Sequence, residues 1–294
     1  MKVGWILPNF GPHASREDLL ATARSAERLG FDSVWATDHL LLPRADASRF
    51  GHIYEALTTL AFLAGTTERI HLGVSSLVLP MRDPILVAKQ IAALDALSSG
   101  RTMLCVSVGW SAGEYANLGQ SFTNRGRRLD EAIHVLRLLW SGPAEDGITF
   151  QGRHYAFTEG ISSPLPSQPG GPPIWIGGNS PAAIHRAAAL GDGWHATSLT
   201  CDALRSGVAA LRAQAGDRQI TVSLRVRLSF RPAPGGEGLQ GTAVQVSDSL
   251  QAYLQAGLDY PVISPAASDP AEREDDMARF VDEVLPALDP PHRG

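Results

Sequence analysis

Short apolar runs alternate along the chain with longer stretches in which apolar residues recur every three or four positions. Residues 70–78 form one such run and carry two adjacent small hydroxyl residues, Ser75 and Ser76, near its end. A helical spacing follows over 85–97, and residues 102–108 form a second apolar run. Two buried strands separated by one helix predict a βαβ unit of a parallel sheet. Small residues at the end of a strand let a flat ligand approach the backbone, so this unit predicts a cofactor site.

The same alternation extends over the whole chain and predicts eight strands and eight helices. The strands are expected at 3–7, 32–37, 70–78, 102–108, 173–176, 194–197, 220–230 and 260–263. The helices are expected at 15–29, 54–67, 85–97, 126–140, 181–190, 202–215, 246–256 and 270–288. Between 141 and 172 the pattern lapses into Gly-, Pro- and Ser-rich sequence, which we interpret as an insertion with one short hairpin over 148–157. A Gly-rich loop is expected at 232–241.

Strict alternation indicates an α/β protein with a (β/α)8 TIM barrel, in which residues 1–294 form one domain and 141–172 an insertion after the fourth βα unit. Short turns such as Gly30-Phe31-Asp32, where a helix ends at glycine and an aspartate precedes the next strand, are typical of the stability face of such a barrel. A doubly wound open sheet is the competing architecture. It requires a Gly-x-Gly-x-x-Gly turn after the first strand, where this chain has Pro8-Asn9-Phe10-Gly11-Pro12.

Composition excludes several classes of partner. The 294 residues are 44% hydrophobic and 19% charged, which suits a globular protein with a large core. With a net charge of -5 and no run of more than two Lys or Arg, the chain lacks the electrostatic signature of a protein that binds nucleic acid or a membrane surface. Cys105 and Cys201 show no metal-ligand spacing, so no metal site is expected. The apolar run before Pro8 is too short for a signal peptide, and we expect a cytoplasmic protein.

Candidate chemistry lies where the strands end, because the active sites of these barrels lie at the C-terminal ends of the strands. Asp38 and His39 follow the second strand, and His39 offers a group that titrates near neutral pH. A helix cap beside a surface histidine is the alternative interpretation of this pair. The segment Gly177-Gly178-Asn179-Ser180-Pro181 ends a strand and opens a helix, so its backbone N–H groups predict a phosphate site. A flexible loop is the alternative there.

Several segments resemble the luciferase-like monooxygenase superfamily. The sequence Gly30-Phe31-Asp32-Ser33-Val34-Trp35-Ala36-Thr37-Asp38-His39 resembles its second-strand signature. Further matching segments lie at 72–80, 84–97, 101–119, 125–132, 172–180 and 182–194. Together they cover roughly residues 1 to 200 in the expected order. Within the superfamily the chain is most similar to the branch that uses coenzyme F-420, an 8-hydroxy-5-deazaflavin.

This resemblance implies a barrel that holds a deazaflavin or FMN at the C-terminal ends of its strands. It also implies a non-proline cis peptide after strand three, which by position is the bond between Ser75 and Ser76. The residues that would then flank or line the cofactor ring are Thr37, Asp38, His39, Ser75, Ser76, Ser107, Gly109 and Trp110. The cofactor phosphate is assigned to Gly178, Asn179 and Ser180, with Gly177 as a further cofactor contact.

One position departs from the sugar-phosphate dehydrogenases of the family. In that branch a catalytic carboxylate directly follows the glycine that ends strand four, whereas here Trp110 follows Gly109. The nearest carboxylate, Glu114, lies four residues further on and is not expected to reach the ring. We therefore expect a small hydrophobic substrate instead of a sugar phosphate.

The residues and the resemblance together predict an F-420-dependent oxidoreductase that transfers a hydride between C5 of the deazaflavin and a C=C, C=O or C=N bond. His39 is the expected proton relay, and Asp38 is expected to orient it. The first alternative is an FMN-dependent monooxygenase that uses O2 and receives reduced flavin from a separate flavin reductase. The second is a flavin-binding barrel without turnover. Because members of the family are often dimers, a homodimer is expected.

Overall fold

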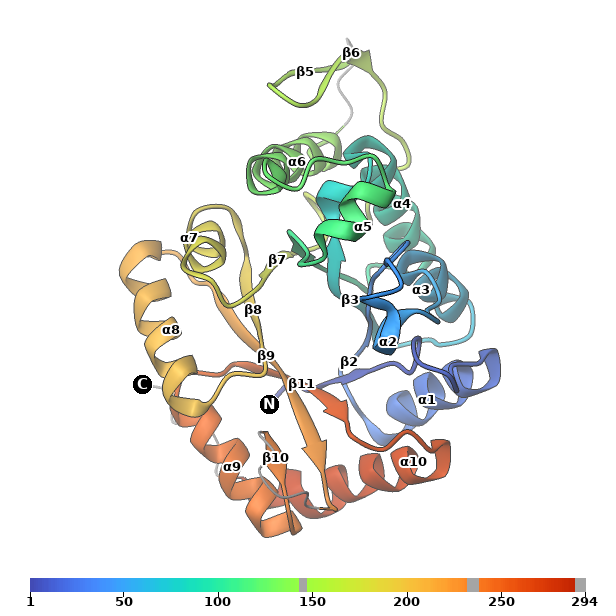
Figure 1. The fold of residues 1–294 in the computed structure, drawn as a ribbon, viewed down its shortest axis with the longest axis vertical. Coiled ribbons are helices and arrows are strands. Elements are labelled where there is room, and N and C mark those ends of the chain that lie inside the picture. The colour runs from blue at the N-terminus through green and yellow to red at the C-terminus, as the bar shows by residue number, and fades with distance from the viewer. Residues whose placement is uncertain (143–146, 232–237, 289–294) are drawn as a thin grey trace. The chain divides into compact units, whose positions relative to one another are not determined.

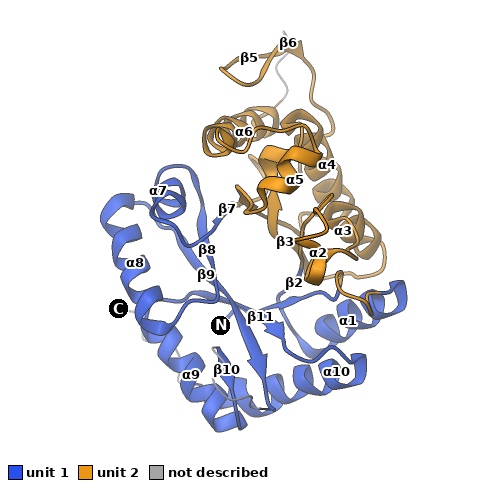
Figure 2. Cartoon of the chain, in the orientation of Figure 1, with its two compact units in different colours: residues 1–8, 15–35, 175–294 blue, residues 9–14, 36–174 orange. Residues whose placement is uncertain are grey.

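The computed structural model describes residues 1–142, 147–231 and 238–288, and the chain divides into two compact units (Figure 2). Unit 1 comprises residues 1–8, 15–35 and 175–294, and unit 2 comprises residues 9–14 and 36–174. Three parts of the predicted elements lie outside the described residues: 143–146 of the insertion, 232–237 of the Gly-rich loop and 289–294 of the predicted domain.

The strands of unit 1 form parallel pairs. They are β1 (Gly4–Ile6), β2 (Ser33–Ala36), β7 (Ile174–Gly177), β8 (Gly193–Thr197), β9 (Thr221–Ser229), β10 (Leu239–Gln240) and β11 (Tyr260–Pro265). Their order is β7-β8-β9-β11-β1-β2, and β10 also pairs with β9 (Figure 1). The register sets Trp5 opposite Val34 and His195 opposite Ser223. β10 lies within the Gly-rich loop predicted at 232–241, so this part of the loop prediction is wrong: a two-residue strand without a readable period pairs with β9 there.

The helices of unit 1 are α1 (Arg16–Leu29), α7 (Pro181–Leu190), α8 (Cys201–Ala215), α9 (Ala243–Gln255) and α10 (Pro270–Arg279). α1 begins after Ser15, whose hydroxyl accepts the N–H of Asp18 at 3.2 Å, and it ends at the predicted Gly30, which has a φ of 85°. The helix predicted over 270–288 ends earlier, and the chain continues as a π-helical turn (Phe280–Val284) and a 3-10 turn (Leu285–Ala287). Pro286 has no N–H to donate to the preceding turn, so a regular α-helix cannot continue through it.

Unit 2 contains the parallel pair β3 (His71–Val78) and β4 (Thr102–Ser107). Its predicted insertion carries the antiparallel hairpin β5 (Ile148–Gln151) and β6 (Ala156–Gly160). Its helices are α2 (Ala47–Phe50), α3 (Ala56–Ala64), α4 (Pro84–Leu97), α5 (Ala112–Asn117) and α6 (Arg125–Trp140), with a 3-10 turn at Leu79–Met81. The sequence did not predict α2 and α5, because helices of four and six residues are too short to show a helical period.

The fold is the (β/α)8 barrel that the sequence predicts, with β1–β4, β7–β9 and β11 as its strands. In unit 1 the Trp35 ring stacks on Trp175 at 5.3 Å and on His195 at 5.6 Å between ring centroids. His195 Nδ1 lies 2.9 Å from Ser223 Oγ. Burial lowers the pKa of His195 to about 3, so this imidazole is neutral at physiological pH. Within the described residues, no helix combines the length and the apolarity needed to cross a membrane.

Candidate active site

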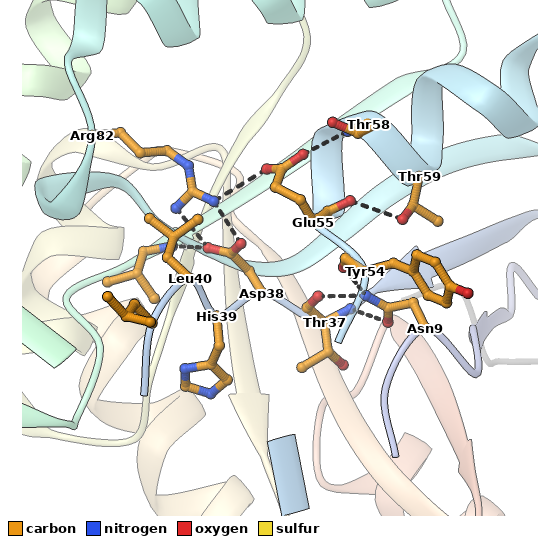
Figure 3. A network of polar contacts seen from close by, with 12 residues as sticks. Asn9, Thr37, Asp38, His39, Leu40, Tyr54, Glu55, Thr58, Thr59 and Arg82 are labelled. Atoms are coloured by element: carbon orange, nitrogen blue, oxygen red, sulfur yellow. Dashed lines mark hydrogen bonds and ion pairs between the residues drawn. The ribbon is translucent and has the colours of Figure 1, made fainter. Parts of the chain in front are cut away.

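Asn9 fixes the backbone just beyond β2 (Figure 3). Its side-chain amide donates to the carbonyl oxygen of Thr37 at 2.8 Å and to that of Tyr54 at 3.0 Å. Its side-chain oxygen accepts the N–H of Thr37 at 2.9 Å. Asn9 and Thr37 are both buried. The chain therefore leaves β2 in one conformation, which sets the directions of the next two side chains.

Asp38 belongs to a buried ion-pair network (Figure 3). Its carboxylate accepts hydrogen bonds from the Arg82 guanidinium at 2.7 and 2.9 Å and from the N–H of Val78 at 2.9 Å. Arg82 also contacts Glu55 at 3.2 Å. Burial raises the pKa of Asp38 above its ordinary value, against the opposing effects of Arg82 and the Val78 amide. Asp38 thus joins the ends of β2 and β3, and the prediction that it orients His39 is wrong.

Glu114 is the carboxylate that holds His39. Nδ1 of His39 lies 2.9 Å from Glu114 Oε2, and Oε1 accepts the N–H groups of Leu40 at 2.6 Å and Leu41 at 3.3 Å. Glu114 is completely buried. Burial raises the pKa of its carboxyl, but the hydrogen bonds from His39 and the two amides outweigh burial and hold the pKa below its ordinary value. Glu114 is therefore ionised at neutral pH and accepts a proton-bearing Nδ1.

Aromatic side chains surround the His39 imidazole. Its centroid lies 4.9 Å from that of Phe50 in α2 and 5.7 Å from that of Trp110. Phe10 lies 5.0 Å from Phe50, and the guanidinium of Arg49 lies over both rings. Trp110 is 55% exposed, whereas His39 is buried. The rings in contact with the His39 imidazole are therefore aromatic, and one of them, Trp110, is exposed.

The peptide bond between Ser75 and Ser76 is cis, as the sequence predicts. It lies in β3, where the pairing with β4 shifts register between Val74 and Leu77. Such a shift is a bulge that places the two hydroxyl residues outside the regular ladder. Ser75 is buried and Ser76 is half-buried. Contact of these two residues with a cofactor ring stays a prediction.

Three more of the predicted site residues, Ser107, Gly109 and Trp110, lie at the end of β4 and directly after it. Ser107 is the last residue of β4 and is half-buried. Gly109 has a φ of 64°, and a Cβ there would lie 2.7 Å from Cγ1 of Val78. Glycine is therefore required at this position. Trp110 comes next and meets the His39 ring edge to face, so the structure brings these two predicted site residues together.

In unit 1 the predicted phosphate segment opens α7. Ser180 caps the helix by accepting the N–H of Ala183 at 3.2 Å, and Pro181 occupies its first turn, as predicted. Gly178 has a φ of 125°, and its N–H donates to the carbonyl oxygen of His195. The Asn179 side chain bonds both backbone groups of Thr197, at 2.7 and 3.0 Å. The N–H of Gly178 is therefore engaged within the chain, whereas the N–H groups of Asn179 and Ser180 make no hydrogen bond to another described residue. Binding of a phosphate at this segment stays a prediction.

The sequence interpretation did not assign Arg82 and Glu114 to the site, although the sequence around each of them indicates a local structural role. Arg82 directly follows the apolar stretch that ends at Met81, and a charge beside buried residues requires a partner. Ser111 and Glu114 have the spacing of a capping box, which predicts a short helix. Ser111 does accept the N–H of Glu114 at 3.1 Å, but the Glu114 side chain turns to His39 instead of back to the cap. In the described residues there is no cluster of three His, Cys, Asp or Glu side chains that could bind a metal ion.

A (β/α)8 barrel that carries a buried histidine–carboxylate pair among aromatic side chains after its strands has the architecture of an enzyme. The sequence model described as luciferase-like monooxygenase matches residues 1–235, and the chain belongs to this family. It is accordingly an oxidoreductase.

Curated relatives include an F-420-dependent glucose-6-phosphate dehydrogenase from Kineococcus radiotolerans, 31% identical over 275 residues, which cover 89% of this chain and 74% of the relative. A protein of the same name from Intrasporangium calvum is 31% identical, with coverage of 96% and 85%. A monooxygenase structure from Streptomyces bottropensis superposes with a TM-score of 0.82 at 21% identity, covering 97% of this chain and 99% of that one. An F-420-dependent secondary alcohol dehydrogenase, in complex with an F-420–acetone adduct, gives 0.82 at 17% identity, with coverage of 98% and 99%. At these identities the two structures show the shared fold.

Proposed function

We propose that the protein uses coenzyme F-420 and transfers a hydride between C5 of the deazaflavin and a C=C, C=O or C=N bond of a small apolar substrate. The observation that carries this proposal is the buried His39 imidazole. Its Nδ1 is held by Glu114, while its Nε2 makes no hydrogen bond within the described residues. The names of the relatives, which specify F-420, support the choice of cofactor. The proposal takes residues 1–294 as one domain with 141–172 inserted, acting in the cytoplasm as a homodimer.

The residues present fit such a cofactor. At the N-terminus of α7 the N–H groups of Asn179 and Ser180 make no hydrogen bond to another described residue, and the helix dipole favours a phosphate there. Gly177 and Gly178 have no side chains that would block this approach. The residues that would contact the ring are Thr37, His39, Ser75, Ser76, Ser107, Gly109 and Trp110.

When bound, the deazaflavin supplies the carbon that carries the hydride. The chain supplies the proton. In the reducing direction the protonated His39 donates from Nε2 to the substrate, and in the oxidising direction the neutral Nε2 accepts a proton. Phe50 and Trp110 exclude water from one side of the imidazole. Asp38 makes its contacts with Arg82 and Val78, so it acts by positioning the end of β2.

An apolar substrate is supported by the side chains around His39. Arg82 is paired with Asp38 and Glu55, and the guanidinium of Arg49 lies over aromatic rings. Trp110 stands where the sugar-phosphate branch of the resembling family has a carboxylate. A charged sugar phosphate would meet an exposed indole there. We therefore propose uncharged unsaturated carbonyl compounds, ketones or imines as substrates, although the named relatives are glucose-6-phosphate dehydrogenases.

Equilibrium binding of F-420 and of FMN to the purified protein, followed by calorimetry and fluorescence quenching, tests the choice of cofactor. We expect tight binding of F-420 and weak binding of FMN. Reduced F-420 should then be oxidised by unsaturated carbonyl compounds without O2, while oxidised F-420 should not be reduced by glucose 6-phosphate. His39→Ala should lower kcat by about 100- to 10,000-fold and leave the Kd for F-420 within about threefold.

A preference for reduced FMN, with a product that contains an atom from O2, would instead establish the monooxygenase alternative. The family description, luciferase-like monooxygenase, favours this as the second candidate. In that case turnover requires a separate flavin reductase, and adding one to the assay should restore it. Binding of neither cofactor would refute both candidates.

A further inference from the structure

We propose that Glu114 is a positioning residue that fixes the tautomer and the direction of the His39 imidazole. The inference rests on the proposed function only in that His39 is taken as the proton relay. The observation behind it is the way in which the Glu114 carboxylate is used. One oxygen contacts Nδ1 of His39, and the other accepts the N–H groups of Leu40 and Leu41, the two residues that follow His39.

These contacts determine where the proton of a neutral His39 resides. A carboxylate only accepts hydrogen bonds, so Nδ1 must carry the proton, and Nε2 is left with a lone pair. An unconstrained neutral imidazole in water has the opposite preference, with its proton mainly on Nε2. Glu114 therefore selects the tautomer in which Nε2 can accept a proton. The same carboxylate would stabilise the imidazolium that forms when Nε2 has accepted that proton.

The position of Glu114 is itself built into the local structure. Its backbone N–H is capped by Ser111, whose hydroxyl donates to Asp46 at 2.5 Å. A Cβ on Gly113 would lie 2.6 Å from Cγ of Pro43, so α5 can rest against the loop after His39 only because this residue is glycine. α5 is thus held from two sides, and the carboxylate enters beside the imidazole in a fixed direction.

No neighbouring carboxylate takes the place of Glu114 within the part of the chain that the structure describes. Asp38, adjacent in sequence, is committed to Arg82 and to the N–H of Val78. Glu55 contacts Arg82 and the N–H of Thr58. Loss of the Glu114 carboxylate should therefore release the imidazole, and no other acid should restore its orientation.

Ring-nitrogen NMR of 15N-histidine-labelled protein tests the tautomer without any cofactor. In the wild type at a pH where His39 is neutral, we expect the proton on Nδ1. In Glu114→Gln the amide oxygen should turn to the N–H groups of Leu40 and Leu41, which leaves its NH2 group facing Nδ1. That arrangement requires an unprotonated Nδ1, so the proton should move to Nε2. Wild-type His39 with its proton on Nε2 would overturn the proposal, even if the variant does not fold.

Glu131→Gln is the matched control. The Glu131 carboxylate accepts the backbone N–H groups of Arg153, His154 and Tyr155, as Glu114 accepts those of Leu40 and Leu41, but it belongs to α6 and does not contact His39. The tautomer of His39 should be the same in this variant as in the wild type. A change of tautomer in Glu131→Gln equal to that in Glu114→Gln would mean a general structural effect and would overturn the assignment.

Kinetics test whether Glu114 acts through His39. Glu114→Gln should lower kcat at least tenfold and leave KM and the Kd for F-420 within about threefold. The double variant His39→Ala with Glu114→Gln should be no slower than His39→Ala alone, because residues that act as a unit are not additive. A further tenfold loss in the double variant would overturn the proposal. Failure of the wild type to bind F-420 would refute the proposed function, whereas the NMR result decides the positioning role separately.

Discussion

Replacing Asp38 by asparagine tests whether this buried carboxylate is a structural clamp. The substitution keeps the size of the side chain and removes its charge. Oδ2 receives the N–H of Val78 at 2.9 Å and one Arg82 nitrogen at 2.9 Å, and Oδ1 receives the other Arg82 nitrogen at 2.7 Å. An amide keeps one accepting oxygen and places its NH2 group against a donor. Arg82 would retain only Glu55, at 3.2 Å, as its charged partner.

Removing one partner of a buried ion pair costs about 3–5 kcal/mol. Because Glu55 remains beside Arg82, we expect the lower end of this range, about 3 kcal/mol out of a total of about 5–15 kcal/mol. For a chain of this size that loss lowers Tm by roughly 5 °C. Urea unfolding followed by tryptophan fluorescence measures it, provided that the m-value is unchanged.

The matched control is Asp202→Asn, which removes the partner of Arg205 in an exposed pair with side chains 93% and 57% accessible. Its unfolding midpoint should equal that of the wild type within error, because exposed ion pairs contribute little. A loss below about 1 kcal/mol in Asp38→Asn would refute the clamp, since one broken buried pair costs more. If Asp38→Asn is as stable as the wild type but inactive, Asp38 takes part directly in the reaction.

Three further predictions concern other parts of the chain. The pKa of about 3 for His195 predicts a loss of stability in acid, because between pH 6.5 and 4.5 the unfolded chain takes up a proton that the folded chain does not. The unfolding free energy should fall by about 2–3 kcal/mol over that range. Urea titrations should show this loss in the wild type but not in His195→Gln, and equal losses in both proteins would contradict the prediction. Burial raises the pKa of Glu131, but three backbone amides outweigh burial and hold the pKa below its ordinary value. The hairpin contact should therefore persist at and above the ordinary pKa and be lost as the pH falls through the lowered one. Protection from hydrogen exchange over 148–160 should fall at that point, and Glu131→Gln should show reduced protection already at pH 7. Gly178→Ala, at a φ of 125°, should weaken F-420 binding at least tenfold in calorimetry. Gly216→Ala, likewise at positive φ but at the C-terminal end of α8, should not. Equal affinities of the two variants would remove Gly178 from the phosphate site.

The sequence predicts the barrel well because each of its elements carries a local signal of sufficient length. α6 shows a helical period through Leu129, Ile133 and Leu136, all of which are completely buried. α1 and α7 begin within one residue of the predicted positions, each after a serine that caps it. The helices α2 and α5 have no such period, and yet they bring Phe50 and Glu114 to His39. The parts of the site that the sequence missed are therefore those that depend on short elements and on contacts between distant residues.

The partner of His39 could not be inferred from its neighbour in sequence, because successive side chains of an extended segment point to opposite sides. Figure 3 shows the imidazole directed away from the Asp38–Arg82 pair. A carboxylate for His39 must then come from another element, and α5 supplies it from 75 residues further along the chain. This arrangement also explains how Trp110 can occupy the position of a carboxylate without loss of acid–base chemistry. The carboxylate of Glu114, four residues after Trp110, contacts Nδ1 of His39, so position 110 can carry an aromatic side chain that contacts the same ring. In the proposed reaction Nε2 of His39 therefore both donates and accepts the proton, and Glu114 holds the other nitrogen of the same ring.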